Sequence, residues 1–213
     1  MSEKASPRER PRLLGAAAPE LRATADLRVA CQLIGAYEAP AGRQRTLQRE
    51  ILATIERFPR TAHLRTCLPG HLTASALVVD EQRERVLLLH HRKLGKWLQP
   101  GGHCDGDANV LGVAFREARE ETGLDALAID PRVLDLDIHE IPARPGEPAH
   151  LHLDTRFLVI APRDARPRRN EESNELRWFT PQEALAVADD SLARLVRLLL
   201  LQGPTHAQSE DGR

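Results

Sequence analysis

Aromatic residues are scarce in this 213-residue chain, where Phe, Trp and Tyr together make up only 3%. Proteins that bind single-stranded nucleic acid stack its bases on aromatic side chains, so this scarcity argues against such a surface. Cysteine is equally sparse: Cys31, Cys67 and Cys104 are odd in number, widely spaced and without a CxxC pair. Neither a disulfide framework nor a cysteine zinc site is therefore expected.

An excess of one charge is also missing, because 30 Lys and Arg stand against 31 Asp and Glu, for a formal net charge of −1. This balance predicts no general attraction to nucleic acid or to acidic membranes. No apolar run approaches the roughly 20 residues that a membrane-spanning helix needs, and the first residues lack the apolar core of a signal peptide. We expect a soluble, cytoplasmic protein. Its hydrophobic content of 41% is enough for a real core.

The most informative stretch is 101–124, GGHCDGDANVLGVAFREAREETGL. At about 100° per residue its second half forms a helix with an apolar stripe. Glu121 falls inside this stripe and Glu117 at its edge, although a carboxylate facing a core costs several kcal/mol unless it is compensated. The two glutamates also repel each other one turn apart, near a helix C-terminus that disfavours negative charge. A bound divalent cation of the hard, oxygen-preferring kind would resolve all three conflicts.

The same residues resemble the signature of the Nudix hydrolases, which cleave nucleoside diphosphates linked to other groups. That signature is a glycine, five residues, a glutamate, seven residues, and then Arg-Glu-aliphatic-x-Glu-Glu-x-Gly-aliphatic. Here it runs from Gly102 to Leu124, over 23 residues, with its spacing intact. The solvated-face interpretation, in which the glutamates pair with Arg116 and Arg119 at the surface, is disfavoured by these flanking residues.

One position departs from the signature, because Ala108 stands where the first glutamate is expected. In the family that glutamate mainly supports the loop and the helix through the arginine, here Arg116, rather than holding metal. Asp105 and Asp107 are the candidates to take over its role.

The resemblance implies a site for Mg²⁺ or Mn²⁺ ions that bridge the phosphates of a diphosphate substrate. Its ligands would be the carboxylates of Glu117, Glu120 and Glu121 and the carbonyl oxygen of Gly102. Either Glu120 or Glu121 would accept the proton of the attacking water, and Arg116 would orient the glutamates. The double glycine allows close approach or unusual backbone angles, so that this loop can turn a carbonyl toward a metal or an amide toward a phosphate.

Before residue 71 the sequence predicts a tail and two helices. Residues 1 to about 25, rich in Arg, Pro, Ala and Glu, are expected to form a mobile tail or a loosely docked arm. Helices are expected over 27–37 and 43–58, the second ended by Pro59. This pair could cap the domain, shape the substrate cleft or join two subunits of a homodimer, and we expect it to pack on the catalytic domain.

From residue 71 onward the pattern changes to strands, the first two forming a hairpin. They are expected over 72–79, 86–90, 133–141, 151–160 and 176–179. Asp107 suits the N-cap of the glutamate-bearing helix. Thr180 and Glu183 form a capping box at the start of the C-terminal helical segment, which could restart near Asp190.

These elements predict an α/β protein, with a mixed sheet between helices in an α/β/α sandwich. The Nudix resemblance implies the same fold. The expected divisions are a tail and helical extension over 1–70, a Nudix domain over 71–203 and a disordered tail over 204–213.

Histidines gather around the expected site, in its loop, in the later strands and at the end of an early strand. They are His103, beside Cys104, then His139, His150 and His152, and then His90 and His91. A cleft rich in histidine could bind metal or phosphate, but lone histidines are mostly structural. His103 is the best candidate for a direct role because of its loop.

Two sets of charged residues near the last strand, one acidic and one basic, are the remaining candidates for the site. Some Nudix enzymes draw a further glutamate from a loop in this region, as general base or metal ligand. Its candidates here are Glu171, Glu172 and Glu175, although a solvated acidic loop is the simpler interpretation. Arg166, Arg168 and Arg169 could meet a substrate phosphate or form a basic surface loop.

The predicted function is metal-dependent hydrolysis of a diphosphate linkage in a nucleoside diphosphate derivative or related small molecule, without nucleic acid or membrane as partner. Two alternatives stay open. The Nudix fold also carries isopentenyl diphosphate isomerase, which needs a reactive cysteine and a histidine-containing metal site, and Cys104 beside His103 is compatible with it. A non-catalytic nucleotide-binding module is the other, suggested by Ala108, although such proteins usually lose the metal glutamates. No substrate-selecting motif is evident.

Overall fold

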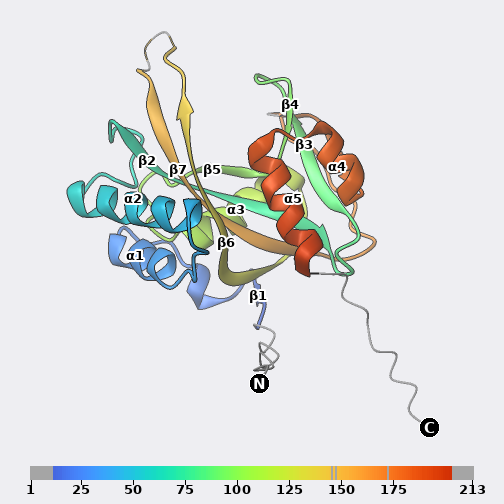
Figure 1. Ribbon diagram of the computed structural model, residues 1–213. Coiled ribbons are helices and arrows are strands. Elements are labelled where there is room, and N and C mark those ends of the chain that lie inside the picture. Colours follow the sequence, from blue (N-terminus) through green and yellow to red (C-terminus); the bar gives the residue numbers. More distant parts are fainter. Residues whose placement is uncertain (1–11, 145, 147, 172, 203–213) are drawn as a thin grey trace, which may run out of the picture.

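A computed structural model describes residues 12–202 except 145, 147 and 172. The fold is a sandwich in which one mixed sheet lies between two groups of helices (Figure 1). Its helices are α1 (Leu27–Gly35), α2 (Arg43–Arg57), α3 (Val110–Thr122), α4 (Pro181–Val187) and α5 (Asp190–Gln202), with a short 3-10 helix at Pro19–Leu21. Its strands are β1 (Leu14–Gly15), β2 (Gly70–Asp80), β3 (Val86–His91), β4 (Lys96–Leu98), β5 (Gly101–His103), β6 (Ala128–Ile141), β7 (His150–Ala161) and β8 (Ser173–Phe179).

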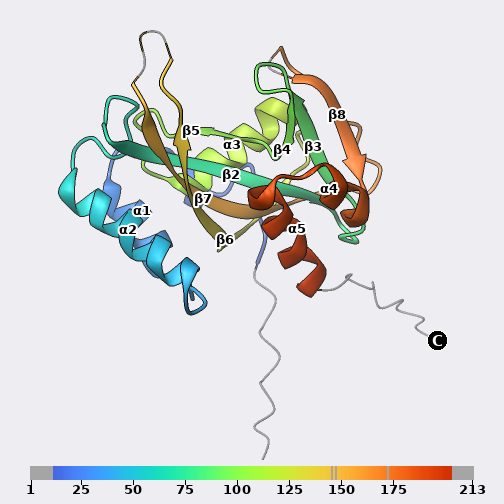
Figure 2. The ribbon, with the colours of Figure 1, turned by 45° about the horizontal axis from the view of Figure 1, so that its top comes forward.

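The described strands run in the order β1-β6-β7-β2-β3-β4, with β5 paired to β2 and β8 paired to β3. The pairing of β2 with β7 is parallel and the other pairings are antiparallel, so the sheet is mixed as expected. The hairpin of β2 and β3 is confirmed. Figure 2 shows β8 beside β3, at the side of the sheet away from α1 and α2.

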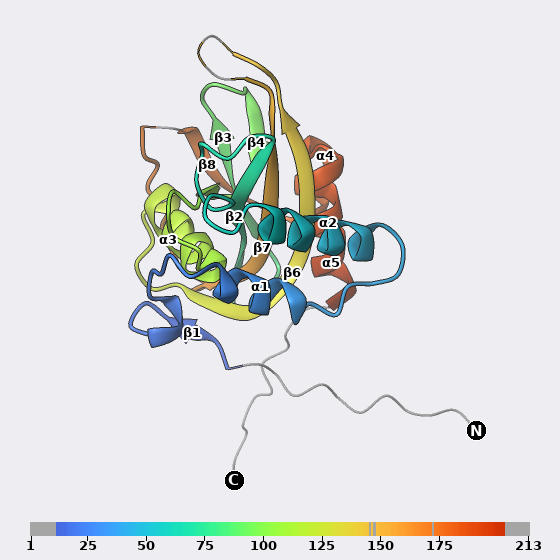
Figure 3. The same ribbon diagram turned by 90° about the vertical axis from the view of Figure 1, so that its left-hand side faces the viewer.

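Both faces of β2 are buried because alternate residues pack against different helices. Ala74, Ala76 and Val78 belong to the apolar core that α1, α2 and α3 cover. Leu77 and Val79 belong to a second core, under α4 and α5. Figure 3 shows α3 on one side of the sheet and α4 and α5 on the other. The predicted α/β/α sandwich is therefore confirmed.

The N-terminal helical pair packs on β6. The side-chain amide of Gln44 in α2 accepts from the backbone N–H of Leu136 at 3.1 Å and donates to its carbonyl at 3.0 Å. These two bonds satisfy the N–H and carbonyl groups of Leu136. The pairing of β6 with β7 shifts register just before this residue, between Val133 and Asp135. The expected packing of the extension on the sheet domain is confirmed. Within the described residues, no helix has both the length and the apolarity that a membrane span needs.

The segment before α1 is docked, so of the two expectations for this region the docked arm, not the mobile tail, describes residues 14–24. β1 pairs with β6, and the side-chain amide of Asn109 donates to the carbonyls of Glu20 and Arg22 at 2.8 and 3.0 Å. The carbonyl of Thr24 accepts from the N–H of Ala108. The backbone carbonyls of this segment thus accept hydrogen bonds from the residues that precede α3. Residues 1–11 and the tail expected over 204–213 lie outside the described residues.

The N-cap of α3 is Asn109, not Asp107 as expected. The helix begins at Val110, and the side-chain oxygen of Asn109 accepts from the N–H of Gly112 at 3.3 Å. Asp107 lies two residues too early and accepts instead from the N–H groups of Thr24 and Asn109. The capping box of α4 and the helix restart at residue 190 are both confirmed.

The double glycine, expected in a loop, lies in the short strand β5. Gly101 pairs with Ser75 and Gly102 with Ala74 of β2. A Cβ added at Gly101 would lie 2.5 Å from the Cβ of Ser75. Close approach, rather than a positive φ, is therefore what requires glycine here.

Candidate active site at strand β5 and helix α3

Two of the predicted carboxylates converge on β5 from α3. The N–H of Gly101 donates to Oε2 of Glu121 at 2.8 Å, and Glu121 is only 7% exposed, as its place in the apolar stripe predicted. A Cβ added at Gly102 would lie 2.5 Å from Oε2 of Glu117. Only glycine therefore lets this carboxylate lie against the strand.

Glu120, the third predicted ligand, lies on a different side of the helix. Its side chain is exposed, and it lines a hollow with Arg116, Arg119 and Arg168. Arg168 reaches this position because its backbone N–H donates to the carbonyl of Thr122, at the end of α3, at 2.7 Å. One of the three arginines considered for phosphate binding thus lies beside a predicted catalytic glutamate.

Arg116 joins the loop to the glutamates. Its guanidinium donates to Oε1 of Glu117 at 3.1 Å and to the carbonyl of His103 at 3.4 Å. It also forms an ion pair with Asp107 at 3.5 Å. Asp105, the other candidate to replace the family glutamate, pairs with Arg65 instead, at 2.6 Å. Asp107 therefore supplies the acidic partner that Ala108 cannot.

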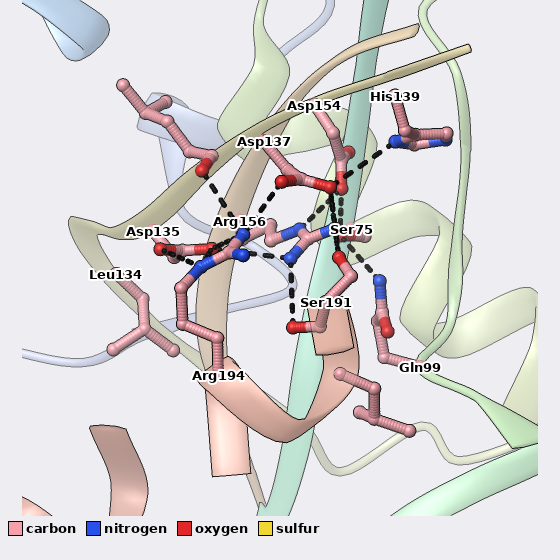
Figure 4. Close-up of polar contacts among 12 residues, drawn as sticks. Ser75, Gln99, Leu134, Asp135, Asp137, His139, Asp154, Arg156, Ser191 and Arg194 are labelled. Carbon is pink, nitrogen blue, oxygen red and sulfur yellow. Dashed lines mark hydrogen bonds and ion pairs between the residues drawn. The ribbon is translucent and has the colours of Figure 1, made fainter. Parts of the chain in front are cut away.

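The opposite face of the sheet carries a buried polar network (Figure 4). At its centre Arg156 of β7, 2% exposed, pairs with Asp154 at 2.8 Å, Asp137 at 3.0 Å and Asp135 at 3.3 Å. Burial acts to lower the pKa of Arg156, but the three carboxylates outweigh it and raise the pKa. The guanidinium therefore stays charged, and Arg194 of α5 pairs with Asp135 and Asp137 at 2.8 Å each.

Five histidines continue this polar face toward the start of β2 and β7. This histidine cluster consists of His71, His103, His139, His150 and His152. The Nε2 atoms of His103 and His152 lie 3.2 Å apart, and those of His150 and His152 lie 3.4 Å apart. Burial lowers the pKa of His103 to about 4, and burial together with His103 lowers the pKa of His152 to about 2.

Sequence reasoning missed His71, Arg156 and the aspartates of the network. The signal that could have found them is alternation. In β7, His150, His152, Asp154 and Arg156 stand two residues apart and alternate with Leu151, Leu153 and Thr155. Residues two apart share one face, so these polar groups had to meet on one side of the sheet.

The remaining candidates are not brought to β5 by any contact described. Glu171 and Glu175 are exposed, and Glu172 lies outside the described residues. His90 contacts the ring of Trp97, with centroids 5.2 Å apart. His91 accepts from the N–H of Lys93 at 3.2 Å.

Cys104 is 1% exposed, and burial raises the pKa of its thiol far above the ordinary value. The nucleophilic form of cysteine is the thiolate. A buried thiol of this kind does not suit the reactive cysteine that the isomerase alternative needs.

Comparison with known proteins decides the family. A family model described as NUDIX domain matches residues 69–199. The chain belongs to the Nudix family. The match overlaps the range 71–203 expected for the Nudix domain, and it contains α3 with Glu117, Glu120 and Glu121.

Individual relatives are more distant. The chain is 30% identical over 118 residues to a CMP-5'-(N-acetyl-N-hydroxy-3-aminopropyl)phosphonate hydrolase of Streptomyces rubellomurinus, covering 52% of each protein. It thus spans about half the length of this curated relative. Among solved structures, the C. elegans Ap4A hydrolase binary complex has a TM-score of 0.52 at 18% identity, covering 62% of this chain and 96% of that one. The MutT protein of Methanosarcina mazei Go1 has a TM-score of 0.50 at 19% identity, covering 63% and 95%. At these identities the likeness shows the fold alone.

Proposed function

We propose that this protein hydrolyses a diphosphate linkage in a nucleoside diphosphate derivative or related small molecule, with Mg²⁺ or Mn²⁺ as cofactor. The observation that carries the proposal is the placement of Glu117 and Glu121 against Gly102 and Gly101, within a Nudix signature on a Nudix fold. A buried carboxylate is costly without compensation, and a cation beside it would supply that compensation.

The residues present fit a hard divalent cation. Carboxylates and a backbone carbonyl form an all-oxygen donor set, which Mg²⁺ and Mn²⁺ prefer. Glu117, Glu121 and the carbonyl of Gly102 would hold the ion, with Glu120 as the further carboxylate. When bound, the ion would supply charge neutralisation on the phosphates and activation of water.

The protein's own residues have three tasks in this proposal. Arg116 holds Glu117 in place and is itself held by Asp107. The N–H of Gly101 fixes the orientation of Glu121. Glu120 or Glu121 would accept the proton of the attacking water. Glu120 faces the hollow that Arg168 lines, where a basic side chain would attract a phosphate.

The names of the relatives support a proposal for the substrate class. The curated relative is named for a CMP-linked phosphonate and one structural neighbour for Ap4A. We therefore propose a small nucleotide-linked substrate rather than a nucleic acid or a membrane. A panel should contain a CMP-linked phosphonate, dinucleoside polyphosphates, ADP-ribose, nucleotide sugars and nucleoside triphosphates.

The test is release of phosphate or nucleotide from this panel, with Mg²⁺ or Mn²⁺ added to metal-stripped protein. We expect metal-dependent turnover of at least one member, and a loss of at least ~10²-fold in Glu121→Gln and in Glu120→Gln if each carboxylate has its proposed task. Glu140→Gln, at an exposed position of β6, is the matched control and should keep full activity. Full metal-dependent activity in Glu121→Gln would refute the proposal.

A second assay tests the isomerase alternative. Interconversion of isopentenyl and dimethylallyl diphosphate, followed without phosphate release, should be absent, because the thiol of Cys104 is buried and protonated. Ligand-induced stabilisation without any turnover would favour the non-catalytic alternative instead.

A further inference from the structure

The histidine cluster contains three imidazoles that come from three different strands. His71 begins β2, His103 ends β5, and His152 lies near the start of β7. One ring nitrogen from each lies within 4.8 Å of the other two. We propose that His71, His103 and His152 form a second metal site, for a divalent transition-metal ion of which Zn²⁺ is the representative.

The spacing of His103 and His152 already suits direct coordination, and the nitrogen of His71, within 4.8 Å of both, would move inward to join them. Zinc–nitrogen bonds of about 2.0–2.1 Å in a tetrahedral arrangement place neighbouring ligand nitrogens roughly 3.3–3.4 Å apart. The Nε2 atoms of His103 and His152 are 3.2 Å apart. His150 places its Nε2 3.4 Å from that of His152 and is the candidate for a fourth ligand.

His71 points to a missing partner at the centre of the cluster. It is 2% exposed; one ring nitrogen lies near the backbone of Cys67 outside good hydrogen-bond geometry, and the other has no polar partner among the described residues. Its ring contacts three others, with centroids 4.9 Å from His150 and 5.2 Å from both His103 and His152. A buried polar group without a partner is destabilising, and a metal ion bound to a ring nitrogen would remove this cost.

The donor atoms select the class of ion. Imidazole nitrogen suits Zn²⁺, Cu²⁺, Ni²⁺ and Fe²⁺, whereas Mg²⁺ prefers oxygen. Coordination needs the neutral imidazole. Two different ions are therefore expected on the two faces of β5.

The alternation of β5 keeps the two sites apart. Gly102 pairs with Ala74 and faces α3, whereas His103 pairs with Thr73 on the other face. An ion held by the histidines would tie β2, β5 and β7 together directly behind Gly102. It would thereby fix the strand against which Glu117 and Glu121 lie.

The test uses the full chain stripped of metal, then incubated with Zn²⁺ in the presence of excess Mg²⁺, and desalted. Elemental analysis should find one zinc per wild-type chain, and Co²⁺ in place of Zn²⁺ should give the visible spectrum of a tetrahedral nitrogen-ligated ion. His71→Gln and His152→Gln should each lower zinc affinity at least ~10-fold, as measured by competition with a chromogenic chelator.

Two controls separate this site from the glutamates and from nonspecific binding. Glu117→Gln alters the predicted carboxylate site and should keep the zinc. His90→Gln changes a histidine outside the cluster and should also keep it. Circular dichroism and a thermal unfolding transition confirm folding of each variant, and the wild-type Co²⁺ spectrum does not depend on any variant.

Three results would overturn the proposal. The first is a wild-type chain that retains no stoichiometric zinc and shows no tetrahedral Co²⁺ spectrum. The second is zinc that both histidine variants retain unchanged. The third is zinc that Glu117→Gln loses while the histidine variants keep it. The cluster would then be a hydrogen-bonded imidazole network.

Discussion

The two faces of the sheet at β5 differ in how their charged and polar groups are satisfied. On the α3 face, Glu121 accepts a hydrogen bond from the backbone N–H of Gly101, and Glu117 accepts one from Arg116. Glu120, on the same helix, is exposed to solvent. On the other face, Arg156 and its aspartates are buried and fully paired, whereas His71, on the same face, makes no hydrogen bond of good geometry through its ring nitrogens within the described residues.

This difference distinguishes groups that stabilise the fold from groups whose placement indicates a bound ligand. A buried charge that is fully paired can be explained without any ligand. A carboxylate held against glycine, or an imidazole without a partner, is better explained with one. The predictions below test the two explanations against each other.

The largest effect should come from the saturated network. Arg156→Met leaves three buried aspartates without their central partner, so we expect a loss of about 3–5 kcal/mol in the free energy of unfolding. Urea denaturation measures it. Arg163→Met is the control, because Arg163 is exposed and pairs with Glu84 at 3.8 Å on the surface, and its loss should cost at most about 1 kcal/mol. Equal losses in both variants would mean that burial does not set the energy of the network.

A smaller effect, on activity rather than stability, should follow from Gly102→Ala. The added Cβ would meet the mobile end of Glu117, which can move aside, so the fold should survive while the carboxylate is displaced. We expect metal-dependent activity to fall by about 10²-fold, with little change in the unfolding midpoint. Gly35→Ala, where an added Cβ meets nothing within 4 Å, should leave activity unchanged. Unaltered activity in Gly102→Ala would remove Glu117 from the site.

The replacement of the family glutamate by Asp107 can be tested next. Asp107→Asn removes the charge opposite Arg116 and should cost about 1–2 kcal/mol of stability together with part of the activity. Asp105→Asn removes the charge from an exposed pair with Arg65 and should cost less than about 1 kcal/mol. Thermal unfolding and initial rates measure both. The reverse order would assign the supporting role to Asp105.

The smallest effect should be a change in acid sensitivity. Burial acts to raise the pKa of Asp137, but hydrogen bonds and the charges of Arg156 and Arg194 outweigh it and hold the pKa below the ordinary 3.8. The unfolded chain therefore binds this proton first as pH falls. The stability that Asp137 contributes is complete at neutral pH and is lost progressively below about pH 4.

Urea midpoints measured from pH 7 down to pH 2.5 check this. The difference in stability between wild type and Asp137→Asn, about 1–2 kcal/mol at neutral pH, should shrink as the solution becomes acidic. The exposed Asp164→Asn should follow the wild type throughout. A difference that grows on acidification would contradict the assigned direction.

Sequence patterns predicted the α3 face well because its information is local. The signature from Gly102 to Leu124 covers the end of β5, the following loop and α3, so helical periodicity alone placed Glu121 toward the core. The N-cap was misplaced at Asp107 because the true partners of that side chain, Thr24 and Arg116, include a residue 83 positions away.

The other face depends on contacts between strands that lie far apart in the sequence. His71 and His152 are neighbours only because β2 and β7 pair in parallel register. No local pattern fixes that register, although the alternation in β7 shows that its polar residues share a face. For the same reason the sequence left residues 14–24 open between a mobile tail and a docked arm, because the residues that dock them are distant in the sequence.

The most direct test of the carboxylate site is a crystal of the protein grown with Mn²⁺ and examined by anomalous diffraction at the manganese edge. The account predicts a manganese peak bounded by Glu117, Glu121 and the carbonyl of Gly102. A well-ordered site with these carboxylates turned into solvent and no anomalous peak beside β5 would contradict it.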